Sequence, residues 1–218
     1  SRRKAMKMAA TGGLSAVTLG TDFHAPRTNR ITEENKKKGS TDWQLTRVRY
    51  DKSQHRSSLI EGYCSKQSVK AGDKLDIFVS SDPATPFKLD IYRTGYYGGA
   101  GARLVKTIGP LPGKVQTVPS PVGEQRLHEC KWDVSTTLTI PNDWLSGVYI
   151  GKLKTLPADP DIPYWESYII FIVTDNSPVD ILFQCSDNTW QAYNRWPSDF
   201  SLYTDPRGPS GPWRAVSF

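Results

Sequence analysis

The stretch from Lys74 to Tyr92, K-L-D-I-F-V-S-S-D-P-A-T-P-F-K-L-D-I-Y, contains two apolar runs separated by a turn sequence. Apolar and polar residues alternate in Lys74–Val79 and again in Phe87–Tyr92, as in strands that bury one face. Ser81-Asp82-Pro83 between them is typical of a turn. The stretch therefore predicts two half-buried antiparallel strands.

The same pattern recurs further along the chain, in Val148–Leu153 and in Ser167–Val173. Short segments rich in Gly, Pro, Asp and Ser separate the predicted strands, and no long segment has helical periodicity. Regular short strands with such punctuation predict a mostly β protein, with an immunoglobulin-like antiparallel β-sandwich over residues 57–175.

The pattern changes after Asn176-Ser177-Pro178. Val179–Phe183 has the apolar density of a strand covered on both faces, and Asn188–Trp196 could open a helix or an ordered loop. We expect a domain boundary near residue 176, with residues 176–218 forming the incomplete start of an α/β domain. The alternative is that Val179–Gln184 is one more strand of the sandwich.

Charge is distributed unevenly along the chain, whose formal net charge is +6. Residues 1–56 carry 13 Lys and Arg against 5 Asp and Glu, and the remainder carries 15 against 17. The predicted sandwich therefore has no basic excess with which to neutralise phosphates, so we expect no nucleic-acid partner.

The basic front end has the order of an export signal. The basic Ser1-Arg2-Arg3-Lys4 precedes the mildly apolar Met8–Leu19. This order indicates a twin-arginine-like export signal over residues 1–25. Ala5 and Met6 stand where such signals usually have Phe and Leu. The protein is then exported, to the periplasm or the extracellular space. A short surface helix with a basic cap is the alternative. The apolar run is too short for a stable membrane span, and we interpret residues 26–56 as a polar linker.

Three cysteines, Cys64, Cys130 and Cys185, fit an exported chain in which one pair is bridged. Cys64 and Cys130 both fall in the predicted sandwich, so they are the candidate disulfide. Three buried free thiols fit the sequence equally well.

A dense polar and aromatic segment follows the apolar run at 179–183, at the place where open α/β sheets present functional groups. Ser186 lacks the G-x-S-x-G context of a serine nucleophile. None of the three histidines, His24, His55 and His128, has a context typical of a catalytic triad. A serine hydrolase is therefore disfavoured.

The glycine-rich segment Gly95–Arg103 lies between two predicted strands, and it lacks the Gly-Lys-Ser/Thr of a phosphate-binding loop. We interpret it as a hairpin or bulge that needs positive φ. Tyr96 and Tyr97 are expected at its tip, where they could contact another domain or subunit.

Four blocks follow one another along the chain: Ile60-Glu61-Gly62-Tyr63, Asp90–Gly101, Trp144–Tyr149 and Ser186–Asn194. They recur in this order in the large, or beta, subunit of N,N-dimethylformamidase, which residues 59–218 resemble. The resemblance implies a sandwich joined to an α/β domain similar to that of glutamine amidotransferases. It also implies hydrolysis of a small amide, a formamide, to an amine and formate at a mononuclear iron held by two tyrosines and a glutamate. A homo-oligomer or a small partner subunit is expected from the same resemblance.

By motif, Tyr193 is the expected first tyrosine ligand of the iron. The resemblance places the second tyrosine and the glutamate beyond Phe218, so this segment by itself is expected to be inactive. The expected neighbours of the ligand, which would orient it or bind substrate, are Asp187, Asn188, Trp190 and Gln191. The alternatives are that Tyr193 packs as an ordinary aromatic residue and that Asp187 and Asn188 cap a helix.

A second functional hypothesis rests on the seven Trp and ten Tyr residues. Aromatic faces stack on sugar rings, so the sandwich could be a non-catalytic binding module for carbohydrate or protein. Exposure of Trp132 and Trp144 discriminates between the two hypotheses, because structural tryptophans are buried.

Overall fold

The computed structural model describes residues 29–51, 56–123, 127–179, 181–197 and 201–203, together with the backbone of residues 216–217. The predicted signal over residues 1–25 lies outside these ranges. The elements in chain order are α1 (Arg30–Asn35), β1 (Glu61–Cys64), β2 (Ser68–Val69), β3 (Lys74–Ser80), β4 (Phe87–Thr94), the 3-10 helix η1 (Tyr97–Gly99), β5 (Ala102–Leu111), β6 (His128–Glu129), β7 (Thr136–Thr139), β8 (Gly147–Thr155), β9 (Glu166–Val173), α2 (Asp187–Tyr193) and β10 (Val216–Ser217).

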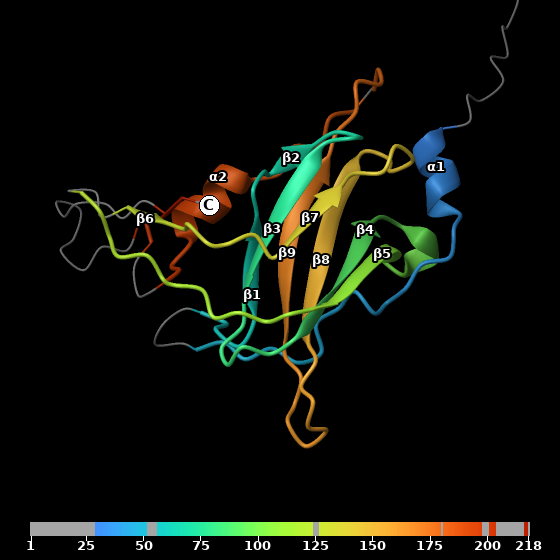
Figure 1. The fold of residues 1–218 in the computed structure, drawn as a ribbon. Helices are drawn as coiled ribbons and strands as arrows, with labels where there is room; N and C mark the ends of the chain where they lie inside the picture. The colour runs from blue at the N-terminus through green and yellow to red at the C-terminus, as the bar shows by residue number, and fades with distance from the viewer. Residues whose placement is uncertain are drawn as a thin grey trace, which may run out of the picture.

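Two sheets pack face to face, as Figure 1 shows. The smaller has the strand order β1-β3-β7, and the larger has the order β2-β9-β8-β4-β5. Within these two sheets neighbouring strands are antiparallel except for β2, which pairs in parallel with β9. Strands β6 and β10 form a separate parallel pair. The mostly β sandwich predicted from sequence is therefore confirmed, while its immunoglobulin-like character stays a prediction.

Strand β3 shows why the alternating pattern predicted the sandwich. Leu75, Ile77 and Val79 are buried, whereas Asp76 and Phe78 between them are partly exposed. Successive side chains of a strand point to opposite faces, so one face of β3 enters the core. Residues of both sheets meet there in a single apolar cluster.

A strap formed by residues 40–47 crosses the outer face of the larger sheet. Lys152 of β8 donates from Nζ to the carbonyl oxygens of Asp42 and Gln44, at 2.9 and 2.8 Å. Glu166 of β9 accepts through Oε2 from the backbone N–H of Thr46 at 2.8 Å. Residues 40–47, which belong to the predicted polar linker over residues 26–56, thus lie on the sandwich and are held there through their backbone groups. The division of the chain into linker and sandwich stays a prediction.

Helix α1 is joined to the glycine-rich hairpin between β4 and β5 by a buried carboxylate. Glu34 accepts hydrogen bonds from the Tyr97 hydroxyl at 3.0 Å and from Arg103 Nε at 2.8 Å, and it pairs with Lys37. Burial alone would raise the pKa of Glu34, but hydrogen bonds from Lys37, Arg103 and Tyr97 lower it to about 2. The carboxylate therefore holds its charge while it ties α1 to the sheet.

The predicted glycine-rich hairpin is formed, since β4 and β5 pair in antiparallel register around it. Gly98 and Gly101 have φ of 66° and 86°, the region that glycine adopts at low cost. Tyr96 is exposed at the tip, as expected. Tyr97 is buried instead, because its hydroxyl lies between Glu34 and the Arg93 guanidinium.

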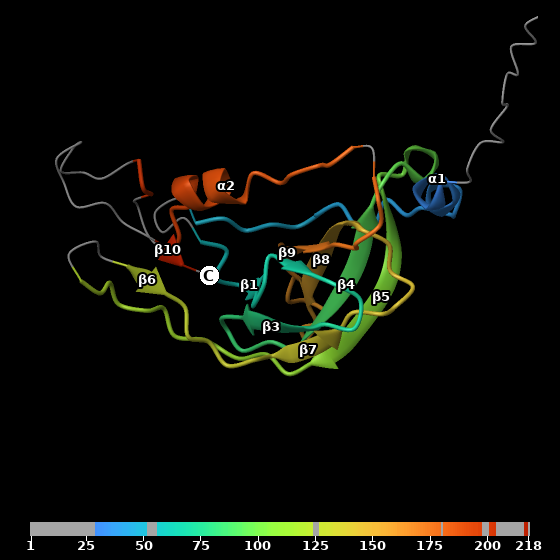
Figure 2. The ribbon, with the colours of Figure 1, turned by 90° about the horizontal axis from the view of Figure 1, so that it is seen from above.

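The buried strand predicted for Val179–Phe183 is not formed by the residues of this range that the structure describes, 179 and 181–183. Ile181, Leu182 and Phe183 lie in chain without regular structure and are 86%, 84% and 78% exposed. This segment runs from β9 along the sandwich to α2 (Figure 2) without pairing to a strand. A strand needs a neighbour for its backbone hydrogen bonds, so the predicted α/β domain is not visible in the described residues.

No helix in the described parts of the chain is long and apolar enough to cross a membrane.

Candidate functional site

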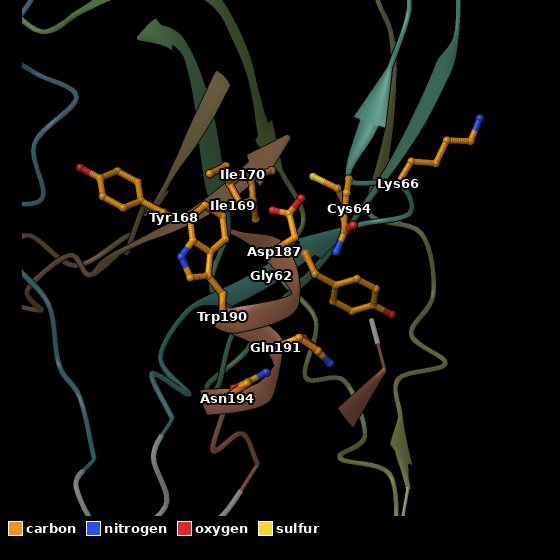
Figure 3. Close-up of a pocket in the computed structure, with 12 residues that line it drawn as sticks. Gly62, Cys64, Lys66, Tyr168, Ile169, Ile170, Asp187, Trp190, Gln191 and Asn194 are labelled. Carbon is orange, nitrogen blue, oxygen red and sulfur yellow. The ribbon is translucent and has the colours of Figure 1, made fainter. Parts of the chain in front are cut away.

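Helix α2 carries most of the residues that the sequence singled out, and it lies beside β1 and β9 (Figure 3). It begins after Ser186, whose carbonyl oxygen accepts from the Trp190 backbone N–H at 3.0 Å. The chain just beyond the helix is fixed to the sandwich, because the Trp196 indole Nε1 donates to Glu61 Oε2 at 3.0 Å. Glu61 therefore helps to position α2.

A cavity of about 340 Å³ separates α2 from the sandwich. In Figure 3 side chains from both sides surround this space. Its walls come from β1, the loop after β1, β9 and α2. The lining residues are Gly62, Tyr63 and Cys64 of β1, Lys66 and Gln67 of the loop, Tyr168, Ile169 and Ile170 of β9, and Asp187, Trp190, Gln191 and Asn194 at α2. This size suits a small ligand.

A second, more polar hollow of about 510 Å³ lies at the start of α2, lined by Gln67 and residues 184–189. Gln67 and Asp187 line both spaces. The structure thus divides the predicted site residues. Asp187, Trp190 and Gln191 face the cavity, and Asn188 lies on the polar hollow.

Tyr193 lines neither space. Its side chain is 64% exposed, and its ring packs against Tyr203, with the ring centroids 4.9 Å apart and the planes tilted by 42°. Tyr203 was not singled out from the sequence, because it lies ten positions further along the chain and no local motif links it to Tyr193.

Two thiols border the cavity and the hollow, and both are protonated at neutral pH. Burial raises the pKa of Cys64 to about 12. Burial, and then the nearby Asp187 carboxylate, raises the pKa of Cys185. Because the thiolate is the nucleophilic form, neither cysteine is activated for nucleophilic attack.

The predicted disulfide between Cys64 and Cys130 is not formed, since all three cysteines are free thiols. Cys130 lies near Tyr63, the residue next to Cys64 in β1. Neighbours in a strand point to opposite faces, so the Cys64 side chain is directed away from Cys130. Cys64 and Cys130 both belong to the predicted sandwich, but this alone does not give their side chains the geometry that a disulfide needs.

The described residues contain neither a serine triad nor a complete metal site. His128 is buried in β6, where Nδ1 lies 2.9 Å from the carbonyl oxygen of Pro119, and it lines neither space at α2. No group of three or more His, Cys, Asp or Glu side chains in the described ranges could hold a metal ion.

The sequence did not single out most of the residues on the sandwich side of the cavity. Lys66, Gln67 and Tyr168 come from a loop and from β9, and no local motif marks them. Gly62 and Tyr63 did belong to the first block of the family resemblance. That block was the signal that could have linked β1 to the site.

A family model described as N,N-dimethylformamidase beta subunit-like, C-terminal, matches residues 88–218. The match includes β4 to β9 and α2, and it runs across the boundary predicted near residue 176. No curated protein matches the chain at a significant level.

Proposed function

Because the chain belongs to the N,N-dimethylformamidase beta subunit-like family, we propose that it takes part in the hydrolysis of a small amide, such as a formamide, to an amine and formate. The observation that carries this proposal is the family match, which includes the whole of α2 and its polar motif. The location of that motif beside a cavity of small-ligand size supports it.

The cavity has the groups that a small amide requires. Gln191 and Asn194 carry amide groups that can donate to a carbonyl oxygen, and Asp187 can accept from an N–H or from water. Trp190 and Ile170 provide apolar surface for alkyl substituents. We propose that these side chains bind the amide and orient it.

Iron is implied by the family and has to be tested against the residues present. Tyr193 and Tyr203 offer two neighbouring phenols, and phenolate oxygen is a suitable hard ligand for ferric iron. The described ranges contain no group of three or more His, Cys, Asp or Glu side chains that could hold a metal ion. A glutamate beside the two tyrosines is not shown by the described residues, and Tyr193 as a ligand stays part of the proposal.

Export and a partner also belong to the proposal. The basic and then apolar order of residues 1–25 supports export by a twin-arginine-like signal. The family description as a beta subunit is the reason to expect a further subunit or a homo-oligomer.

The alternative, a carbohydrate-binding or protein-binding module without catalysis, has less support. Trp132 is 7% exposed, and Trp144 stacks on Tyr149 at the edge of the core, with centroids 4.8 Å apart. Neither tryptophan is exposed on the surface, where a sugar ring would stack. The exposed rings of Tyr193 and Tyr203 are tilted rather than coplanar.

The test uses the product of the complete reading frame, purified with iron, and measures formate and amine released from a panel of small formamides. We expect turnover of at least one formamide. We expect Tyr193→Phe to lower kcat/KM by at least about 100-fold, which is the upper end of the loss usually seen for a residue that supports a metal site. The matched control is Tyr164→Phe, a tyrosine that lines neither space at α2. Absence of turnover on every formamide, with iron bound, would contradict the proposed reaction.

A further inference from the structure

A further cavity, of about 260 Å³, lies between β1 and the chain around Trp132 and Trp196. It is lined by residues from several elements, namely Tyr50, Arg56, Ser57, Glu61, Gly62, Tyr63, Cys130, Trp132, Ser167, Asn194 and Trp196. Gly62, Tyr63 and Asn194 also line the cavity beside α2, whereas the other residues of this set do not. The inference drawn from this cavity does not rest on amide hydrolysis.

Three aromatic rings form the walls of this cavity, and we call Tyr63, Trp132 and Trp196 the aromatic cage. The ring centroids of Tyr63 and Trp132 lie 5.3 Å apart with planes at 52°, and those of Trp132 and Trp196 lie 6.0 Å apart with planes at 74°. Rings set at such angles border a space from different directions instead of forming one stack. Aromatic faces carry partial negative charge, so this arrangement favours a cation.

A buried carboxylate lies in the same cavity. Glu61 is 8% exposed, and its Oε2 accepts from the Trp196 indole Nε1 at 3.0 Å. Burial, and then Glu61, raises the pKa of the neighbouring Cys130 to about 12, so that thiol is neutral. Glu61 is therefore the anionic group of the cavity among its lining side chains.

The chain itself provides a cation at this place. The Arg56 guanidinium pairs with Glu61 and lies over the Trp196 ring, with Cζ 5.9 Å from the centroid. The cavity thus already combines the Glu61 carboxylate, aromatic ring faces and the Arg56 cation. Arg56 enters from the margin of the cavity, next to residues 52–55, which lie outside the described ranges.

From this geometry we propose that the aromatic cage and Glu61 form a binding site for a small alkylammonium ion. The methyl groups of the ion would contact the rings of Tyr63, Trp132 and Trp196, and its charge would face the Glu61 carboxylate, in competition with Arg56. Desolvated cation–π contacts of this kind stabilise quaternary ammonium groups in aromatic cages. The small cavity volume restricts the ligand to a few heavy atoms beyond the ammonium centre.

The test compares choline with 3,3-dimethyl-1-butanol, which has the same shape without the charge. Binding is followed by NMR through the indole N–H signals of Trp132 and Trp196 in the whole chain. We expect a saturable response to choline, with a dissociation constant on the order of 1 mM, and at least about tenfold weaker binding of the neutral alcohol. An equal response to both compounds, or no response at these two indoles, would overturn the proposal.

Two variants separate a binding site from a structural ion pair. Glu61→Gln keeps an acceptor for the Trp196 indole but removes the charge, and we expect it to weaken choline binding by about tenfold. Arg56→Met removes the competing cation, so we expect it to tighten binding. Glu33→Gln in α1, distant from this cavity, is the matched control and should bind as the unmodified chain does. Weaker binding after Arg56→Met would also contradict the proposal.

Discussion

At the scale of single residues, the charged side chains with most influence on the fold are the buried ones. Glu34 receives two hydrogen bonds from Arg103 and one from Tyr97 and pairs with Lys37, although its only sequence signal is a place in a polar segment. Its neighbour Glu33 pairs with Lys36 on the exposed face. Composition does not distinguish the two glutamates, because their partners are set by the fold.

We predict that Glu34→Gln lowers the free energy of unfolding by ~2 kcal/mol at pH 7, since it leaves charged donors without a charged acceptor. The folded-state pKa of Glu34, about 2, lies below its ordinary value of 4.5. The stabilisation is therefore complete above pH 4.5 and is lost as the pH falls from 4.5 towards 2. The melting temperatures of the two proteins should then converge over this acidic range.

The control for that comparison is Glu33→Gln, which removes an exposed pair worth less than ~1 kcal/mol. A gap between Glu34→Gln and the unmodified chain that stays constant from pH 7 to pH 3 would show that the charge of Glu34 does not stabilise the fold.

At the scale of elements, the strap of residues 40–47 depends on an ion pair beneath it. Lys152 and Glu166 are almost fully buried, and their Nζ and Oε1 atoms lie 3.0 Å apart. Both also bond to the backbone of the strap. The sequence pattern did predict strands β8 and β9, but it could not predict that their outer faces would be covered by a polar segment.

We predict that Glu166→Gln destabilises the protein by about 3 kcal/mol, because it leaves the buried Lys152 charge without its anionic partner. The double variant Lys152→Met with Glu166→Gln should be more stable than Glu166→Gln alone. Urea unfolding of the four proteins in a double-mutant cycle measures the coupling. Simple additivity of the two substitutions would contradict the role given to this pair.

The segment between β9 and α2 shows that a run of apolar residues is not necessarily buried. Val179–Phe183 has the composition of a buried strand, yet its described side chains are exposed, because no strand lies beside it. Hydrophobic patterning reports what a segment can bury. It does not say which surface covers it.

We predict that Leu182→Ala changes the free energy of unfolding by less than ~0.5 kcal/mol, as is usual for exposed positions. Leu153→Ala in β8, where the leucine is fully buried, should cost about 2–5 kcal/mol. Chemical denaturation of both variants checks the contrast. Equal losses would mean that Leu182 is packed in solution.

At the scale of the whole molecule, the sandwich could be predicted because strand alternation and turn residues are local signals. The site was predictable on its α2 side alone, where Asp187, Trp190 and Gln191 belong to one motif. Residues from β1, β9 and the loop after β1 join them through tertiary packing. Single-sequence patterns carry no information about such pairings.

The central claim is that these residues provide a scaffold and part of an amide-hydrolysing site, without a complete iron site of their own. The most direct test is the iron content of the purified 218-residue chain after incubation with iron and removal of loosely bound metal, measured together with formate release. We predict much less than one iron per chain and no formate release. One iron per chain, lost on Tyr193→Phe and retained on Tyr164→Phe, would contradict this account.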